Sequence, residues 1–114
     1  FSLRDGNGQD ATALVTESKG RLYLICVTKF DHIEPKCAER LGRVVERAEA
    51  GGAAVLCVTP ERMEATLHSF AGSRQVQCCN IDATVLKTML RATTGLVVLD
   101  NGTIVAKYNC RDIE

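Results

Sequence analysis

Tryptophan is absent from the 114-residue chain, and aromatic residues make up only 4% of it. Proteins that bind single-stranded nucleic acid stack the bases on aromatic side chains, so this scarcity argues against such ligands. An excess of one charge is missing too, because 14 basic and 14 acidic residues give a formal net charge of zero. We therefore expect no nucleic-acid partner.

Long hydrophobic runs are also missing. The longest apolar stretches, residues 22–27 and 95–99, have the length of strands, well short of the ~20 residues that a transmembrane helix needs. The first residues, from Phe1 onward, do not have the pattern expected of a signal peptide. Its length fits one domain, and 46% hydrophobic residues suffice for one core. We expect residues 1–114 to be a single domain excised from a longer protein, or a mature form.

The first half of the chain predicts a strand, a helix and a second strand. The apolar runs 21–27 and 53–58 are typical of strands buried on both faces of a sheet. Between them, apolar residues recur at spacings of three and four, which predicts a helix that ends at Gly51 and Gly52. Its stripe consists of Cys37, Leu41, Val44, Val45 and Ala48. Residues 1–20 predict an entry loop with one helical turn near 11–15.

The second half predicts two more helices and a closing hairpin. Thr59 and Pro60 suit the start of a helix that ends at Gly72. A short strand at 76–79 and a helix capped by Asp82 follow. Asn101-Gly102, between the apolar runs 95–99 and 103–108, is a strong hairpin signal. The inward residues of the two helices are Met63, Leu67 and Phe70, then Val85, Leu86, Met89 and Leu90.

The cysteines number six, at positions 26, 37, 57, 78, 79 and 110, and none forms a Cys-x-x-Cys motif. An even count allows a disulfide framework, but a chain with this much core does not need one. Three of the cysteines occupy apolar surroundings, where cysteine acts as a small hydrophobic residue: Cys26 and Cys57 lie in the strand-like runs, and Cys37 lies on the helix stripe. We therefore expect no disulfides, which favours a reducing, cytoplasmic location. A strand turns neighbouring side chains to opposite faces, so Cys78-Cys79 predicts one core and one surface thiol.

The predicted order β-α-β-α-β-α-β-β resembles the thioredoxin superfamily, in the version found in peroxiredoxins and thioredoxin-like lipoproteins. Three segments carry the resemblance: Phe1-Ser-Leu-x-Asp5-x-x-Gly8, Cys79-Asn-Ile-Asp82, and the hairpin Gly95-Leu-Val-Val-Leu-Asp-Asn-Gly102-Thr-Ile-Val105. The resemblance implies a thioredoxin-like α/β three-layer sandwich. Its central mixed sheet would have about five strands, end in a β-hairpin and carry helices on both faces.

A closer resemblance is to the soluble C-terminal domain of DoxX-type membrane proteins from gut bacteria. The segments Leu86-Lys-Thr-Met-Leu-Arg91, Gly95-Leu-Val-Val-Leu, Gly102-Thr-Ile-Val-Ala-Lys107 and Arg111-Asp112-Ile113 are similar to the late part of that family. The resemblance implies a domain tethered to the membrane through an upstream multi-helix part that this chain lacks. It supplies no catalytic role.

Redox members of the superfamily carry two cysteines in the loop after the first strand, where this chain has Asp31 and Glu34. Their spacing is that of a capping box, with Pro35 in the first turn. Thr94 stands where those members have a cis-proline, and a non-proline residue favours a trans peptide. The resemblance therefore implies that this is not a standard disulfide oxidoreductase.

The candidate binding residues are the positions that match the superfamily's redox site: Lys29, Phe30, Asp31, His32, Glu34 and Thr94. An ordinary βα loop is the alternative. Cys37 is the candidate for catalysis, because a helix N-terminus lowers the pKa of a thiol and Lys36 is adjacent. A buried and inert Cys37 is the competing interpretation, and Cys110, near the chain end, is expected to be exposed.

His32, Cys37 and His68 could donate to a metal, but no metal-binding spacing groups them, so we expect no metal and no cofactor. Two functions remain open. One is a non-catalytic binding or accessory module with a protein or peptide partner, and the other is an atypical redox enzyme that uses Cys37 or Cys110. We expect the few residues after the hairpin to leave little room for the terminal helix that usually covers one face of the sheet in this superfamily. A homodimer through that uncovered face or through an edge strand is a further hypothesis.

Overall fold

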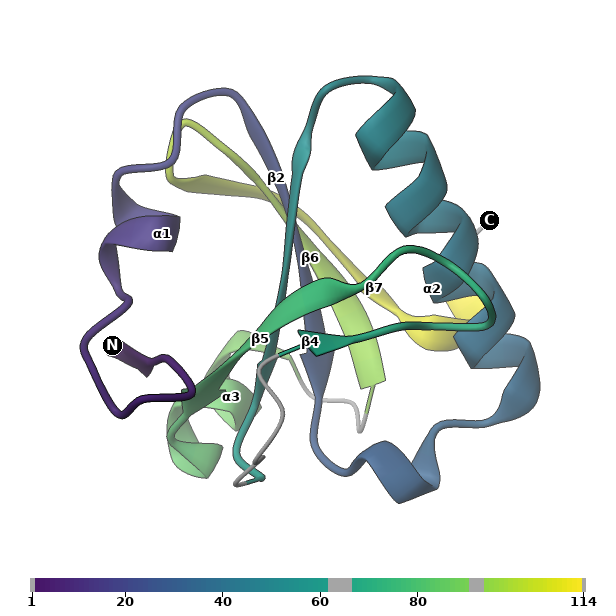
Figure 1. Ribbon diagram of the computed structural model, residues 1–114, viewed down its shortest axis with the longest axis horizontal. Coiled ribbons are helices and arrows are strands. Elements are labelled where there is room, and N and C mark those ends of the chain that lie inside the picture. Colours follow the sequence, from purple (N-terminus) through teal and green to yellow (C-terminus); the bar gives the residue numbers. More distant parts are fainter. Residues whose placement is uncertain (1, 62–66, 91–93, 114) are drawn as a thin grey trace.

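The computed structural model describes residues 2–61, 67–90 and 94–113, which form a mixed sheet flanked by helices (Figure 1). The strands are β1 (Leu3–Arg4), β2 (Arg21–Val27), β3 (Ala54–Thr59), β4 (Leu67–His68), β5 (Val76–Ile81), β6 (Thr94–Asp100) and β7 (Thr103–Asn109). The helices are α1 (Ala13–Thr16), α2 (Pro35–Ala50) and α3 (Ala83–Met89), with the 3-10 turns η1 (Phe30–His32) and η2 (Cys110–Asp112).

The sheet has the order β1-β5-β3-β2-β6-β7, and β4 pairs with β5 outside this path. Strand β3 lies parallel to β2 and β5, whereas the other pairs are antiparallel. The predicted mixed sheet is confirmed, but it has seven strands rather than about five. The added strands, β1 and β4, have two residues each, too few for a period of two to show in the sequence.

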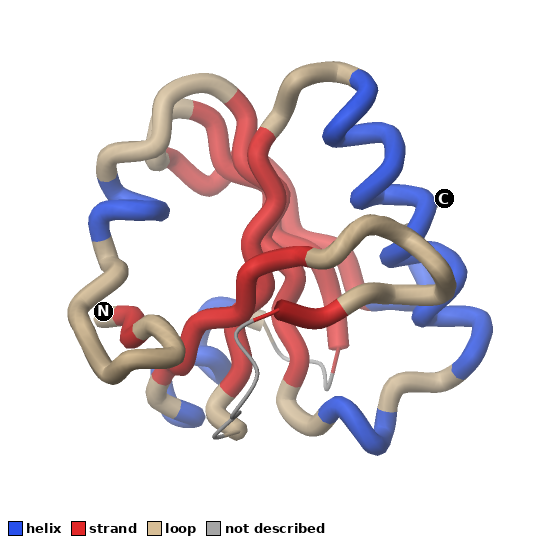
Figure 2. Tube along the Cα trace, viewed as in Figure 1, coloured by secondary structure: helices blue, strands red, loops and turns tan. Residues whose placement is uncertain are grey.

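Helices cover both faces of the sheet, with α2 on one side and α1 and α3 on the other (Figures 1 and 2). One buried cluster lies on the α1 and α3 side and includes Leu24, Cys26 and Leu86. The second lies on the α2 side and includes Ile25 and Leu41. Successive residues of β2 point to opposite faces of the sheet, and both faces are covered by helices. The side chains on either face are therefore buried, which accounts for the continuous apolar sequence of β2.

Helix α2 buries the predicted stripe of Cys37, Leu41, Val44, Val45 and Ala48. Its start differs from the prediction, because the predicted capping box does not form. Glu34 is the N-cap residue but its side chain makes no capping hydrogen bond, and Asp31 lies upstream in η1. Pro35 remains as the start signal, since its fixed φ angle suits the first helical position.

The prediction of a helix that ends at Gly72 is wrong for the described residues from 67 onward, because Leu67 and His68 form β4. Met63 lies outside the described residues. Phe70 is buried, but through a loop that returns the chain over α2 into β5. Gly42 of α2 makes this approach possible, since a Cβ atom there would lie 2.6 Å from the Phe70 carbonyl oxygen. Phe70 is therefore buried by its tertiary contact with α2, and not by lying on the apolar face of a helix of its own.

The later elements agree with the prediction. The Asp82 side chain accepts hydrogen bonds from the backbone N–H groups of Thr84 and Val85, at 2.8 and 3.3 Å, and caps α3. Asn101 and Gly102 turn between β6 and β7 with positive φ angles of 51° and 82°, the backbone that Asn-Gly hairpin turns require. No helix in the described ranges is long and apolar enough to cross a membrane.

Candidate functional site

The loop between β2 and α2 is the candidate site, because it contains five of the six binding residues that the sequence resemblance predicts. Lys29, Asp31, His32 and Glu34 are exposed along it, and Phe30 is half-buried. Thr94 is 6% exposed and lies opposite Val27, the last residue of β2. The register thus brings Thr94 beside the beginning of the loop. Thr93 lies outside the described residues, so the trans peptide before Thr94 stays a prediction.

An aromatic cluster supports this loop from the side of β4. The Phe30 ring lies 4.5 Å from the His68 ring and 6.5 Å from the Phe70 ring, measured between centroids. His68 and Phe70 are 4.9 Å apart in an edge-on arrangement. Burial lowers the pKa of His68, so the imidazole is neutral at pH 7. The sequence does not reveal this cluster, because the spacing of Leu67 and Phe70 predicts a helix there.

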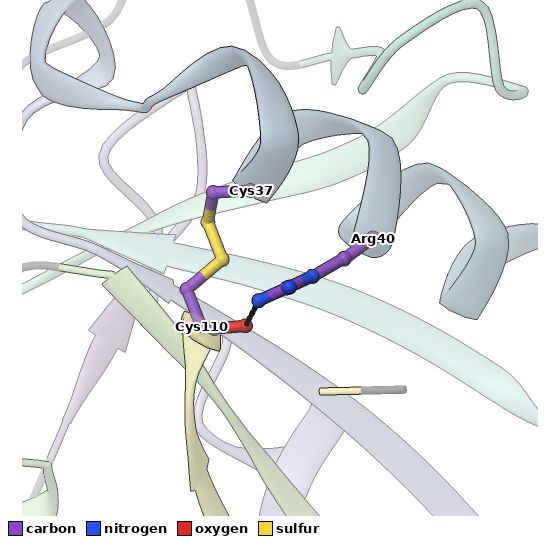
Figure 3. Close-up of a disulfide and its surroundings, with 3 residues drawn as sticks. All are labelled: Cys37, Arg40 and Cys110. Atoms are coloured by element: carbon purple, nitrogen blue, oxygen red, sulfur yellow. Dashed lines mark hydrogen bonds between the residues drawn. A yellow bond between two sulfur atoms is a disulfide. The ribbon is translucent and has the colours of Figure 1, made fainter. Parts of the chain in front are cut away.

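A disulfide joins Cys37 to Cys110, which corrects the expectation that the cysteines stay unpaired (Figure 3). The two Cα atoms are 5.6 Å apart although the residues are separated by 73 positions. Cys37 is the third residue of α2, and Cys110 directly follows β7. Arg40, one turn further along α2, donates a hydrogen bond from Nη1 to the Cys110 carbonyl oxygen at 3.2 Å. The even cysteine count was the only sequence signal for this bond.

The disulfide offers little sulfur surface. Cys37 is 7% exposed and belongs to the core beneath α2, and Cys110 is half-buried against the same core rather than exposed as predicted. Cys37 lies three residues after Glu34, but the bond does not involve position 31 or 34, where the sequence resemblance places the dithiol of redox members. Its evident structural effect is to fasten η2 to the first turn of α2.

The four remaining cysteines are free thiols, and all are buried. Cys26 and Cys79 lie in the cluster on the α1 and α3 side, and Cys57 and Cys78 lie in the cluster on the α2 side. The predicted surface thiol at 78 or 79 is therefore wrong, because helices cover both faces of the sheet.

Burial raises the pKa of the Cys26 thiol to about 12 and also raises the pKa of Cys79. Cys57 and Cys78 are partners in the register of β3 and β5. A hydrogen bond between their side chains, together with burial, raises the pKa of Cys57 well above its usual range. The same hydrogen bond lowers the pKa of Cys78. The raised pKa values of Cys26, Cys57 and Cys79 favour the protonated thiols at neutral pH, which makes these three poor nucleophiles.

Metal ligands do not gather in the part of the chain that the structure describes: no three His, Cys, Asp or Glu side chains lie close enough to hold an ion. His32 is exposed, His68 packs against aromatic rings, and Cys37 is bonded to Cys110. The three donors considered from the sequence therefore have separate surroundings.

No family model matches this chain, and no curated protein matches it. Among solved structures, it is similar to a thiol-disulfide oxidoreductase from Bacteroides fragilis, with 16% identity, a TM-score of 0.64 and coverage of 100% of this chain and 88% of the other. It is also similar to the exposed lipoprotein thioredoxin Etrx1 of Streptococcus pneumoniae, with 15% identity, a TM-score of 0.62 and coverage of 96% and 87%.

A third similar structure is the reduced N-terminal domain of PilB from N. meningitidis, with 12% identity, a TM-score of 0.56 and coverage of 94% and 81%. At these identities the similarity shows the fold alone. The chain has a thioredoxin-like α/β fold.

Proposed function

We propose that this domain is a binding or accessory module that does not exchange disulfides, and that it belongs to a DoxX-type membrane protein. One observation carries the first part of the proposal. The loop that holds the dithiol in redox members presents the carboxylates of Asp31 and Glu34, and every described cysteine is buried or disulfide-bonded. The DoxX assignment rests on the sequence resemblance.

Disulfide exchange with a protein substrate needs a thiolate that a bulky disulfide can approach. The four free thiols are each at most 5% exposed, and Cys37 is already bonded. The carboxylates of Asp31 and Glu34 cannot replace the thiolate, because disulfide exchange proceeds through a mixed disulfide that only a thiolate can form. The geometry thus supports a loop that contacts a partner without reacting with it.

The β2–α2 loop is suited to such contact. Lys29, Asp31, His32 and Glu34 are exposed and of mixed charge, which fits a polar protein or peptide surface. Packing of Phe30 against His68 fixes the middle of the loop. A loop that is already ordered loses less conformational entropy on binding than a mobile one.

The test is insulin reduction in the presence of dithiothreitol, with a thioredoxin of known activity as the positive control. We expect the domain to reduce insulin no faster than dithiothreitol alone. A rate enhancement that disappears in the Cys37→Ala variant would contradict the proposal and support a thiol enzyme. A matched Cys26→Ala variant, which removes a buried thiol on the other face of the sheet, controls for a general loss of stability.

The second candidate function is an atypical thiol redox enzyme that uses Cys37. Its position in the first turn of α2 favours it, because the helix dipole stabilises a thiolate there. An external thiolate would attack Cys110 Sγ and form a mixed disulfide, and Cys37 would leave as the thiolate. A second external thiol would then release Cys110 and complete the reduction.

Equilibration in glutathione buffers, followed by thiol trapping and mass spectrometry, separates the two functions. A structural disulfide has a reduction potential below about −300 mV and resists glutathione. We expect that result. Reduction near the potential of thioredoxins, roughly −270 mV, would favour the redox enzyme.

The DoxX assignment has its own test in the full-length protein. We expect the segment upstream of Phe1 to contain several apolar stretches of ~20 residues, enough to span a bilayer as helices. We also expect the full-length product to sediment with membranes and to resist extraction by salt. An upstream segment without such stretches, or a product that salt releases, would contradict the assignment.

A further inference from the structure

A groove of about 710 Å³ opens on the α2 side of the sheet, over β2, β6 and β7. Its floor is apolar and includes Tyr23, Val44, Leu96, Val98 and Ala106. The register places Tyr23 opposite Val98 and Val98 opposite Ala106, so these side chains form a row across three strands. A concave site of this size, with apolar side chains on its floor and polar groups around them, is a candidate pocket for a small ligand.

Two arginine side chains lie at one end of the groove. They are Arg21, the first residue of β2, and Arg47, in the last turn of α2. The two lie at the same end because α2 leads directly into β3, whose first residue, Ala54, lies opposite Leu22. Asp100 is the register partner of Arg21, yet Arg21 forms no ion pair with any residue that the structure describes.

The C-terminal turn η2 and Ile113 border the other end of the groove. Asp112 and Ile113 line it, and Ile113 is 6% exposed. The Cys37–Cys110 disulfide and the hydrogen bond from Arg40 hold this turn against α2. The groove thus has a row of apolar side chains on its floor, with Arg21 and Arg47 at one end and the Asp112 carboxylate at the other.

We propose that the groove binds a small amphiphile made of an unbranched apolar chain that ends in a carboxylate. The chain lies over the row of Tyr23, Val98 and Ala106, where it displaces water from apolar surface. The carboxylate meets the Arg21 guanidinium, which can donate two parallel N–H hydrogen bonds to the two oxygens of a planar anion. Asp112 repels the same carboxylate, so the ligand has one preferred orientation.

Isothermal titration calorimetry with dodecanoate, below its micelle concentration, tests the proposal on the 114-residue chain. Dodecylammonium has the same chain with the opposite charge, and acetate has the carboxylate without the chain. We expect dodecanoate to bind at one site, dodecylammonium to bind at least fivefold more weakly, and acetate to show no binding. Equal affinity for the two long-chain ions would overturn the proposal, as would the absence of dodecanoate binding.

Two variants locate the site. Arg21→Gln removes the charge from an exposed position, and we expect about fivefold weaker dodecanoate binding, the effect of one solvent-exposed ion pair. Ala106→Phe places a ring on the groove floor and should abolish binding. Arg4→Gln is the matched control, because Arg4 is exposed on β1 at the far edge of the sheet. Unchanged affinity in Arg21→Gln overturns the proposal even if Ala106→Phe does not fold.

Sedimentation identifies a different occupant. If the chain forms a dimer that Ala106→Phe dissociates, and dodecanoate does not bind, a second copy fills the groove and the amphiphile proposal is wrong. This inference goes beyond the proposed function and can fail separately from it. Dodecanoate binding reports on the groove, whereas insulin reduction reports on the cysteines.

Discussion

Reduction of the Cys37–Cys110 disulfide should lower the free energy of unfolding by a large fraction of its total. The bond closes a loop across 73 positions. In the chain-entropy model, such a loop restricts the unfolded chain enough to stabilise the fold by about 4.4 kcal/mol at 25 °C, and native disulfides typically contribute ~2–4 kcal/mol. A domain is stable by only ~5–15 kcal/mol in total. We therefore expect a loss of ~2–4 kcal/mol.

The assay is urea unfolding at pH 7, followed by far-ultraviolet circular dichroism, with and without a phosphine reductant. Free energies should be compared rather than midpoints, because the bond also changes the extent of the unfolded chain and hence the slope. Cys110→Ser is the control, and the reductant should not alter its stability, since the other cysteines are already free thiols. A loss below ~0.5 kcal/mol in the native sequence would refute the reasoning.

Further predictions concern α2, α3 and the aromatic cluster. Gly42→Ala should destabilise the fold by ~1–2 kcal/mol in urea unfolding despite the better helix propensity of alanine, because its Cβ meets the Phe70 carbonyl oxygen at 2.6 Å. Gly51→Ala, whose Cβ would have a nearest contact of 3.4 Å, should change stability much less. Asp82→Ala should cost ~1 kcal/mol through loss of the α3 cap, and an unchanged thermal midpoint would contradict that role. Burial lowers the pKa of His68 below 6.5 in the folded state, so the unfolded chain binds a proton at this residue more readily. The free energy of unfolding should therefore fall as the pH drops from 6.5 toward the lower pKa of the folded state. Well above pH 6.5, His68 should not make the stability depend on pH. The His68→Gln variant should lose this pH dependence, and an NMR titration that gave His68 a pKa of 6.5 or higher would refute it.

Local patterns were enough to predict much of the fold. The strand at 21–27 and the helix that buries Leu41 and Val45 follow from apolar spacing. The Asp82 cap and the Asn101-Gly102 turn follow from backbone preferences within a few residues. In each case the information lies inside the element itself, so no distant contact is needed to specify it.

The errors occur where distant residues decide the outcome. Phe70 is buried because a loop crosses α2 at Gly42, and its spacing from Leu67 resembled a helical stripe. Cys37 also fits its helix stripe as a simple core residue, and only the path of β7 brings Cys110 within reach. The strand register places Thr94 beside the start of the candidate loop, and the packing of Phe30 in that loop against His68 depends on a tertiary contact that local patterns do not contain.

The disulfide also changes how the domain would respond to mechanical tension. A force applied between the two ends of the chain passes through the bond from Cys37 to Cys110, so the residues between them carry no load. Strand β2 lies outside this loop and would be pulled from the middle of the sheet, while β3, β5, β6 and β7 stay within it. The extended length of the oxidised chain would be shorter than that of the reduced chain by about 250 Å, the span of the 73-position loop at ~3.4 Å per residue. Single-molecule pulling would therefore distinguish the oxidised from the reduced domain by the extended length of the unfolded chain.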